Sequence, residues 1–155
     1  MSGLRIVGGE LTLPTQIITD PFVASNAAIG TEKLKHSYKP STTFNSAIGD
    51  APATREEIVM VATSAGTIKG FHAMLNVTGS STDIDFDLKL NGVTVLSSVV
   101  NITNTDADGL VKDGVLSTTA FTIDDIFSIS MAVTTNTGAS GSFAWIDIEE
   151  DNAPS

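Results

Sequence analysis

The chain has 155 residues, of which 41% are hydrophobic, so it can form one domain with a core and an appended segment. Eighteen acidic residues against eight basic ones give a net charge of -10. This charge disfavours nucleic acid and anionic membranes as partners, because few cations are present to displace phosphate counterions. The absence of cysteine excludes disulfides, thiol nucleophiles and cysteine-ligated zinc.

Residues 1–55 differ in composition from the rest of the chain. Their apolar residues follow neither a helical nor a strand period, and four of the five prolines fall here. We interpret residues 1–55 as an extended N-terminal arm with a short strand at Gln16–Ile18. The alternative is a set of irregular loops folded over the domain's own core. The segment contains the main basic cluster of the chain, which is Lys33, Lys35, His36 and Lys39.

The start of the arm has one arginine and no continuous apolar run, so it does not resemble a signal peptide. No other stretch approaches the roughly 20 apolar residues that cross a bilayer. We therefore expect synthesis in the cytosol and no membrane partner.

From Ile58 onward the pattern is that of β-strands, rich in Val, Ile, Thr and Phe and interrupted by Gly, Asn, Asp and Ser. Short strands at this spacing predict an all-β fold, an antiparallel β-sandwich or jelly roll, over residues 56–150, with a short acidic tail at 151–155. The predicted strands are Ile58–Thr63, Thr67–Val77, Asp83–Leu90, Val93–Ile102, Leu110–Leu116, Phe121–Ile123, Ile126–Val133 and Ser142–Glu149.

The stretch DIDFDLKLNGVTVLSS predicts a β-hairpin, since Asn91 and Gly92 both tolerate the positive φ of a two-residue turn. Such a loop fixes the register, and side chains alternate between the two faces. The expected apolar face carries the opposing pairs Leu90–Val93, Leu88–Val95, Phe86–Ser97 and Ile84–Val99. The other face carries Asp83, Asp85 and Asp87, about 6.6 Å apart along the strand. We interpret these aspartates as a solvated acidic face, with an acidic docking patch or a metal site as the alternatives.

Three other strands have an apolar outer surface. The segment Ile58–Ala62 is apolar on both faces, and a strand of that kind needs cover on both sides. If Phe71 and Leu75 face the core, then His72 and Met74 face outward. If Ile146 and Ile148 face the core, then Trp145 faces outward, where it packs under the arm, contacts a second subunit or stacks on a sugar.

The chain has no convincing catalytic motif. NTDADG at residues 104–109 begins like a calcium loop, but the twelfth position is Val115 rather than glutamate, so we interpret it as a polar turn. His36 and His72 have no metal-ligand spacing, and Glu149–Asp151 form a solvated acidic terminus. We expect no enzymatic activity and no cofactor.

The run STTAFTIDDIFSISMAV resembles the corner before the late strands of trimeric jelly rolls, with Asp124-Asp125 in place of the usual Gly-Asp. Together with GTIKGFHAMLN, IDFDLKLNGVTVLSS and FAWIDIEE, residues 56–150 resemble the capsid decoration (cement) and head-fibre proteins of tailed bacteriophages. The resemblance implies a jelly roll, a homo-oligomer that is often trimeric, attachment to the outside of a capsid, and no catalytic residue.

This resemblance makes a virion structural protein our first functional expectation, one that clamps neighbouring subunits of the major capsid protein lattice. A host-recognition or carbohydrate-binding module is the alternative, which the low aromatic content disfavours. The residues expected at interfaces are Lys33, Lys35, His36, Tyr38, Ile58, Val59, Val61, His72, Met74 and Trp145.

Overall fold

The computed structural model describes residues 36–38 and 44–151, and all of the regular structure in these ranges is β. No helix that could cross a membrane occurs in them. The strands are β1 (His36–Tyr38), β2 (Phe44–Asn45), β3 (Arg55–Val61), β4 (Gly66–Val77), β5 (Ser81–Leu90), β6 (Val93–Thr94), β7 (Val100–Thr103), β8 (Lys112–Asp113), β9 (Ala120–Phe121), β10 (Ile126–Thr137) and β11 (Ser140–Glu150).

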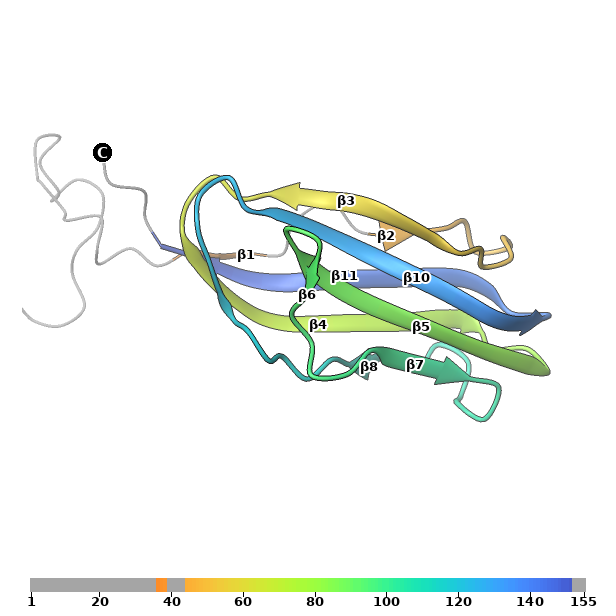
Figure 1. Ribbon diagram of the computed structural model, residues 1–155. Helices are drawn as coiled ribbons and strands as arrows, with labels where there is room; N and C mark the ends of the chain where they lie inside the picture. Colours follow the sequence, from red (N-terminus) through yellow and green to blue (C-terminus); the bar gives the residue numbers. More distant parts are fainter. Residues whose placement is uncertain (1–35, 39–43, 152–155) are drawn as a thin grey trace, which may run out of the picture. The chain divides into compact units, whose positions relative to one another are not determined.

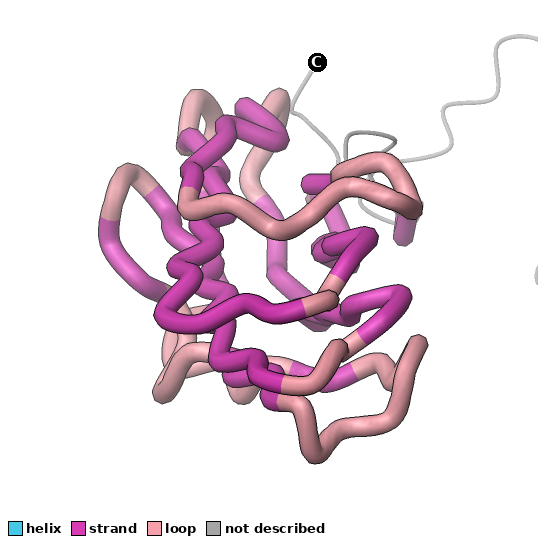
Figure 2. Tube along the Cα trace, turned by 90° about the vertical axis from the view of Figure 1, so that its right-hand side faces the viewer, coloured by secondary structure: helices cyan, strands magenta, loops and turns pink. Residues whose placement is uncertain are grey.

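The strands form two antiparallel sheets that lie face to face (Figures 1 and 2). One sheet, here called the β4–β11 sheet, has the order β1-β11-β4-β8, with β2 also pairing with β11 and β9 with β4. The other, the β5–β10 sheet, has the order β3-β10-β5-β6, with β7 also pairing with β5. The prediction of an all-β fold is confirmed, and the two layers are those of a sandwich.

The core lies between the sheets and is made by alternate residues of the long strands, as the period of two requires. Aromatic rings join the layers. Phe44 of the β4–β11 sheet meets Phe86 of the β5–β10 sheet edge to face, with ring centroids 6.1 Å apart, and Phe121 meets Phe127 in the same way at 5.2 Å. All four residues are at most 3% exposed, so buried aromatic contacts join the two sheets at two points.

The predicted strands all contain β-structure, but their lengths differ from the prediction. β10 continues to Thr137, whereas the predicted strand Leu110–Leu116 is reduced to the two residues of β8. The predicted strand Val93–Ile102 is divided into β6 and β7.

The tip of the predicted hairpin is confirmed. Asn91 and Gly92 have φ values of 52° and 81°, and Leu90 pairs with Val93. One step further, the Val95 N–H donates to the carbonyl of Leu88 at 2.9 Å. The turn therefore sets the register locally, as a two-residue loop does.

Beyond this point the predicted register is wrong. Phe86 pairs with Val100 and not with Ser97, and Ile84 pairs with Ile102 and not with Val99. The chain leaves β5 after Val95 and rejoins it at Val100, which shifts the register by three residues and leaves Val99 43% exposed.

The reason for the detour lies in the opposite sheet. Val95 and Leu96 are consecutive and both are buried, and Leu96 bridges to Leu116 instead of continuing along β5. Gly114 makes room for this, because a Cβ there would lie 3.0 Å from Leu96 and 2.9 Å from Phe71. The open side of the core is closed by this crossing, which a strict hairpin would leave uncovered.

A bulge changes which face of β4 is buried. Ile148 pairs with Ile68 and Asp147 pairs with Gly70, so Lys69 is an extra residue in β4. Lys69 is consequently exposed and Ile68 is buried, the reverse of what strict alternation from Phe71 would give, while Phe71 and Leu75 face the core as expected.

Part of the predicted arm belongs to the sheets. Backbone pairing joins β1 and β2 to β11, and Phe44 of β2 is fully buried. The sandwich therefore includes residues before the predicted boundary at 56. The rest of the predicted arm, including the strand expected at Gln16–Ile18, lies outside the described residues.

Candidate functional site

The outer face of the β4–β11 sheet carries a strip of large side chains. Ala144, Ile146 and Ile148 turn into the core, as predicted, so the alternate residues of β11 face outward. Cross-strand pairing then places Trp145 opposite His72, and Phe143 opposite Met74. We call these four residues the aromatic strip. Each is partly exposed, so the strip is part of the outer surface.

His72 is held in one orientation within this strip. Its ring stacks on Trp145, with centroids 5.1 Å apart and 24° between the planes. Its Nδ1 lies 2.7 Å from Oδ1 of Asp113 in β8, and its Nε2 lies 3.4 Å from Oδ2 of Asp147 in β11. Gly70 makes room for the ring, because a Cβ at that position would lie 2.7 Å from Nε2. The result is a fixed Trp–His platform with carboxylates at its edge.

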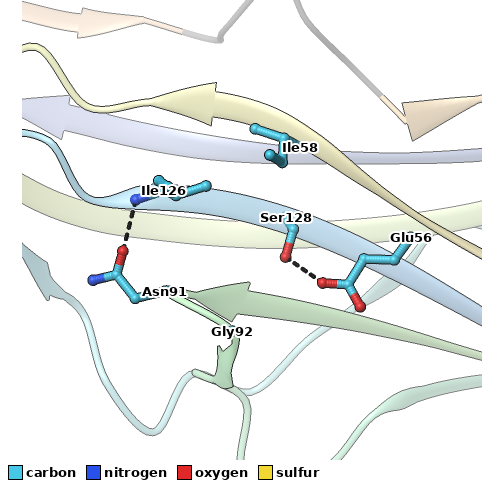
Figure 3. Close-up of a pocket in the computed structure, with 6 residues that line it drawn as sticks. All are labelled: Glu56, Ile58, Asn91, Gly92, Ile126 and Ser128. Carbon is cyan, nitrogen blue, oxygen red and sulfur yellow. Dashed lines mark hydrogen bonds between the residues drawn. The ribbon is translucent and has the colours of Figure 1, made fainter.

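A second apolar area lies on the outer face of the β5–β10 sheet. Val61 pairs with Ile126, and the exposed fractions of Ile58, Val61 and Ile126 are 65%, 51% and 41%. We call Ile58, Val61 and Ile126 the aliphatic patch. Beside it is a hollow of about 390 Å³, lined by Glu56, Ile58, Asn91, Gly92, Ile126 and Ser128 (Figure 3).

Polar contacts hold the walls of this hollow. Ser128 Oγ donates to one oxygen of Glu56 at 2.7 Å, and Lys89 Nζ donates to the other at 2.7 Å. Both bonds lower the pKa of the Glu56 carboxyl below its usual value, and the bond from Lys89 has the larger effect. The Ile126 N–H donates to Asn91 Oδ1 at 2.9 Å (Figure 3). The hollow is a shaped surface with an apolar floor, and its one lining hydroxyl, that of Ser128, is bound to Glu56.

The structure separates the predicted interface residues into groups. His72, Met74 and Trp145 lie together in the aromatic strip, and Ile58 and Val61 lie together in the aliphatic patch. Val59, at 3% exposure, is a core residue and has no surface to offer to a partner. The backbones of His36 and Tyr38 pair with Glu150 and Ile148, while Lys33 and Lys35 lie outside the described residues.

Sequence reasoning missed two contributors to these surfaces. Ile126 was expected only as the start of a strand, although the inward set that begins at Phe127 places it on the outer face. Nothing in the sequence around Asp113 indicated a contact with His72. The contact depends on the two-residue strand β8, which pairs with β4 after the long loop that follows β7.

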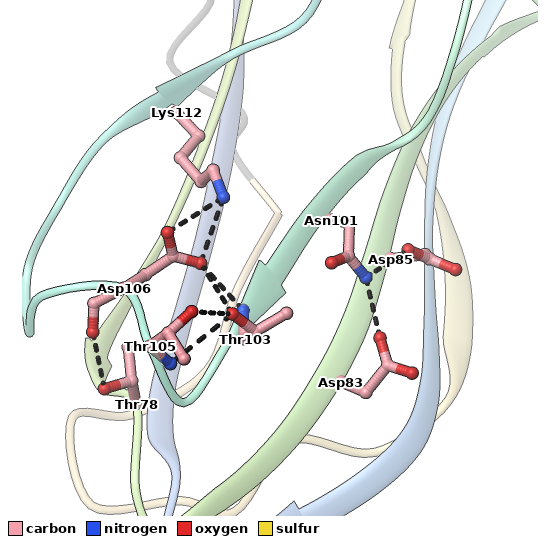
Figure 4. Close-up of polar contacts among 8 residues, drawn as sticks. All are labelled: Thr78, Asp83, Asp85, Asn101, Thr103, Thr105, Asp106 and Lys112. Carbon is pink, nitrogen blue, oxygen red and sulfur yellow. Dashed lines mark hydrogen bonds and ion pairs between the residues drawn. The ribbon is translucent and has the colours of Figure 1, made fainter.

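The loop that resembles a calcium site is a set of internal hydrogen bonds. Asp106 accepts from the Thr103 N–H at 2.8 Å and from Lys112 Nζ at 2.9 Å (Figure 4). Asp108 accepts from the N–H of Thr78 at 2.7 Å. These backbone donors lower the pKa of both carboxyls.

The aspartates of the predicted acidic face of β5 also accept hydrogen bonds from neighbouring side chains. Asn101 Nδ2 donates to Asp83 at 2.7 Å and to Asp85 at 2.8 Å, and Thr94 Oγ1 donates to Asp87 at 2.6 Å (Figure 4 shows the first two). In the part of the chain that the structure describes, no group of three or more His, Asp or Glu side chains is arranged to hold a metal.

Every lysine and arginine side chain in residues 44–151 forms an ion pair within the chain. Residues 44–151 carry fifteen acidic and four basic residues. Each of the four basic residues forms an ion pair; the pairs are Arg55–Glu57, Lys69–Glu149, Lys89–Glu56 and Lys112–Asp106. These ranges therefore offer acidic and apolar surface rather than a basic one.

No protein-family model matches this chain, and no curated protein matches it. Among solved structures, the chain is similar to dimeric latent PorU from Porphyromonas gingivalis, with a TM-score of 0.28 and 13% sequence identity. The match covers 75% of this chain and 11% of that chain. A similarity this low carries no argument about fold or function.

Proposed function

We propose that this chain is a non-enzymatic structural protein of a virion, which decorates the outer surface of a phage capsid and stabilises it by bridging neighbouring capsid subunits. It is made in the host cytoplasm and then joins the capsid surface. Its partners are the major capsid protein lattice and further copies of itself, arranged as a trimer. It takes no cofactor and binds neither nucleic acid nor membrane.

The observation that carries this proposal is the pair of apolar outer surfaces, one on each sheet. A protein that bridges two subunits needs two separate contact areas on a rigid body. The aromatic strip lies on the β4–β11 sheet and the aliphatic patch on the β5–β10 sheet. A rigid sandwich between them fixes their relative orientation. The Trp–His stack is an anchor of the kind that dominates protein interfaces.

The strand order supports the jelly-roll form of the sandwich. Going along the chain, β1 and β2 lie in one sheet, β3 in the other, β4 in the first again and β5 in the second. The same alternation returns with β10 and β11, which insert beside β3 and β4. This alternation between the two sheets supports a jelly roll, in which two Greek keys fold across a pair of sheets. The proposed architecture also includes an N-terminal arm before β1.

Stabilisation would follow from mass action. A protein that binds the assembled lattice and not the dissociated subunits shifts the equilibrium toward the lattice. Each contact must bury on the order of 1,000 Å² to be specific. The acidic surface favours basic regions of the capsid exterior.

The test uses shells assembled from the major capsid protein of the same virus. The purified full chain should sediment with intact shells, should not bind dissociated subunits, and should raise the temperature at which the shells disassemble. Trp145→Ala, which removes the centre of the aromatic strip, should weaken binding at least about tenfold, as loss of an interface anchor does. Val115→Ala is the matched control, since Val115 is 67% exposed and lies outside both surfaces. Equal binding to shells and to free subunits would contradict the proposal.

The second candidate function is a host-recognition or carbohydrate-binding module of a phage fibre. The outward Trp145, with the carboxylate of Asp113 beside its stacking partner, is the observation that favours it, because sugars bind to an aromatic face flanked by hydrogen-bonding groups. A glycan array separates the two candidates. Saturable binding of one glycan class that Trp145→Ala abolishes would support this candidate over the first.

A further inference from the structure

The β3 strand is an unusual edge. It ends its sheet, with β10 on one side and no strand on the other among the described residues (Figure 1). It has seven residues, whereas the other strands at the margins of the two sheets, β1, β2, β6, β7, β8 and β9, have two to four. Proteins commonly blunt their sheet edges by keeping edge strands short. β3 does not have this protection.

The C-terminal half of β3 has no charged side chain that would disfavour pairing with another strand. The charged residues of β3 occupy its first half and are bound within the chain, since Arg55 pairs with Glu57 at 3.2 Å and Glu56 pairs with Lys89 at 2.7 Å. The second half carries Ile58 and Val61, both more than half exposed. An extended strand leaves every second backbone N–H and C=O pointing away from its partner. The pairing with β10 shifts register at Val59, so β3 offers these hydrogen bonds on either side of that bulge, beside the apolar side chains.

The surroundings of this half are acidic. The Ala62 N–H donates to the carbonyl of Asp125 at 2.8 Å, and the Asp124 N–H donates to the carbonyl of Ala62, so both aspartates lie beside the end of β3. The Thr122 N–H and the Asn91 side chain hold the pKa of the Asp125 carboxyl below its usual value, so it is ionised at neutral pH.

We infer that the edge of β3 binds an extended, basic segment of a partner protein by strand addition, with apolar side chains on the aliphatic patch and Lys or Arg beside Asp124 and Asp125. Strand addition takes affinity from backbone hydrogen bonds and specificity from alternate side chains. Charge argues against the other occupants. In a second copy, residues 44–151 bring fifteen acidic and four basic residues, and residues 1–30 bring one arginine against two carboxylates. The basic cluster of Lys33, Lys35, His36 and Lys39 surrounds β1 in the sequence, and β1 already pairs with β11. The inference rests on the proposed function only for the identity of the partner, which would be the major capsid protein.

The test titrates the full chain, labelled with ¹⁵N, with two designed nine-residue peptides, KVTVKVTVK and EVTVEVTVE. The basic peptide should shift the amide resonances of residues 55–61, and the acidic one should bind at least about tenfold more weakly at low salt, because like charges repel. A basic peptide with alternate amides N-methylated should lose binding, since it cannot form the ladder of hydrogen bonds.

Two variants localise the contact. Ile58→Lys should abolish the shifts, because a charged side chain on an exposed edge blocks strand addition. Val93→Lys is the matched control, since Val93 is 68% exposed and lies at the opposite margin of the same sheet, and it should bind as the unaltered chain does.

Other results would overturn the inference. These are shifts centred on the aromatic strip, equal binding of the two peptides, no shift at millimolar peptide, and β3 amides already protected from exchange by residues 1–30 or by a second copy. Failure of the peptide with retained binding to shells would refute strand addition alone. Failure of shell binding with retained peptide binding would refute the capsid proposal alone.

Discussion

Replacement of Phe44 by alanine tests whether the sandwich requires a residue of the predicted N-terminal arm, residues 1–55. The Phe44 ring is fully buried, meets Phe86 edge to face, and lies 4.4 Å below the guanidinium carbon of Arg55. Truncation of a buried phenylalanine costs about 3–5 kcal/mol through lost transfer energy and the cavity left behind. The cation–π contact adds about 0.5–1 kcal/mol. We therefore expect Phe44→Ala to lower the free energy of unfolding by about 4 kcal/mol.

Equilibrium unfolding in urea measures this change, with the fluorescence of the single tryptophan as the probe. With a denaturant dependence of about 2 kcal/mol per molar, the midpoint should fall by about 2 M. Phe143→Ala is the matched control, because Phe143 pairs with Asn45 next to Phe44 but lies partly exposed on the outer face. It should cost about 1 kcal/mol, as loss of half-buried apolar area does. A midpoint shift for Phe44→Ala no larger than that of Phe143→Ala would refute the reasoning.

Three further predictions concern local features. Gly92→Ala should destabilise the chain by about 1 kcal/mol in the same urea experiment, because φ is 81° there and a Cβ disfavours that conformation. The pKa of Asp106 is lowered below its ordinary 3.8, mainly by the Thr103 N–H and also by Lys112. The carboxylate therefore stabilises the fold above about pH 4, and this contribution is lost as the pH falls further. Asp106→Asn should therefore reduce the loss of unfolding free energy measured between about pH 5 and pH 2. Gly70→Ala should push the His72 ring off its carboxylate contact, which a change in the ring's NMR shifts at unchanged overall fold would show.

Some of the fold follows from short stretches of sequence. The Asn91-Gly92 turn and the alternation of β10, with Phe127, Ile129 and Met131 inward, depend on backbone sterics and on a period of two, which act within a few residues. The outward position of Trp145 follows from the same rule. These features were predictable because no distant residue is needed to decide them.

The sequence by itself therefore determined the β-class, the approximate positions of the long strands β4, β5, β10 and β11, and the inward faces of most of their length, because hydrophobic alternation is a local property. Only the tertiary structure decided that residues 96–99 leave β5, that Lys69 bulges out of β4, and that Phe44 fills the core. It also decided that Asp113 reaches His72 and that β3 forms a long edge of its sheet among the described residues. Each of these depends on which strands become neighbours across long sequence separations, where packing of the shared core outweighs local preference.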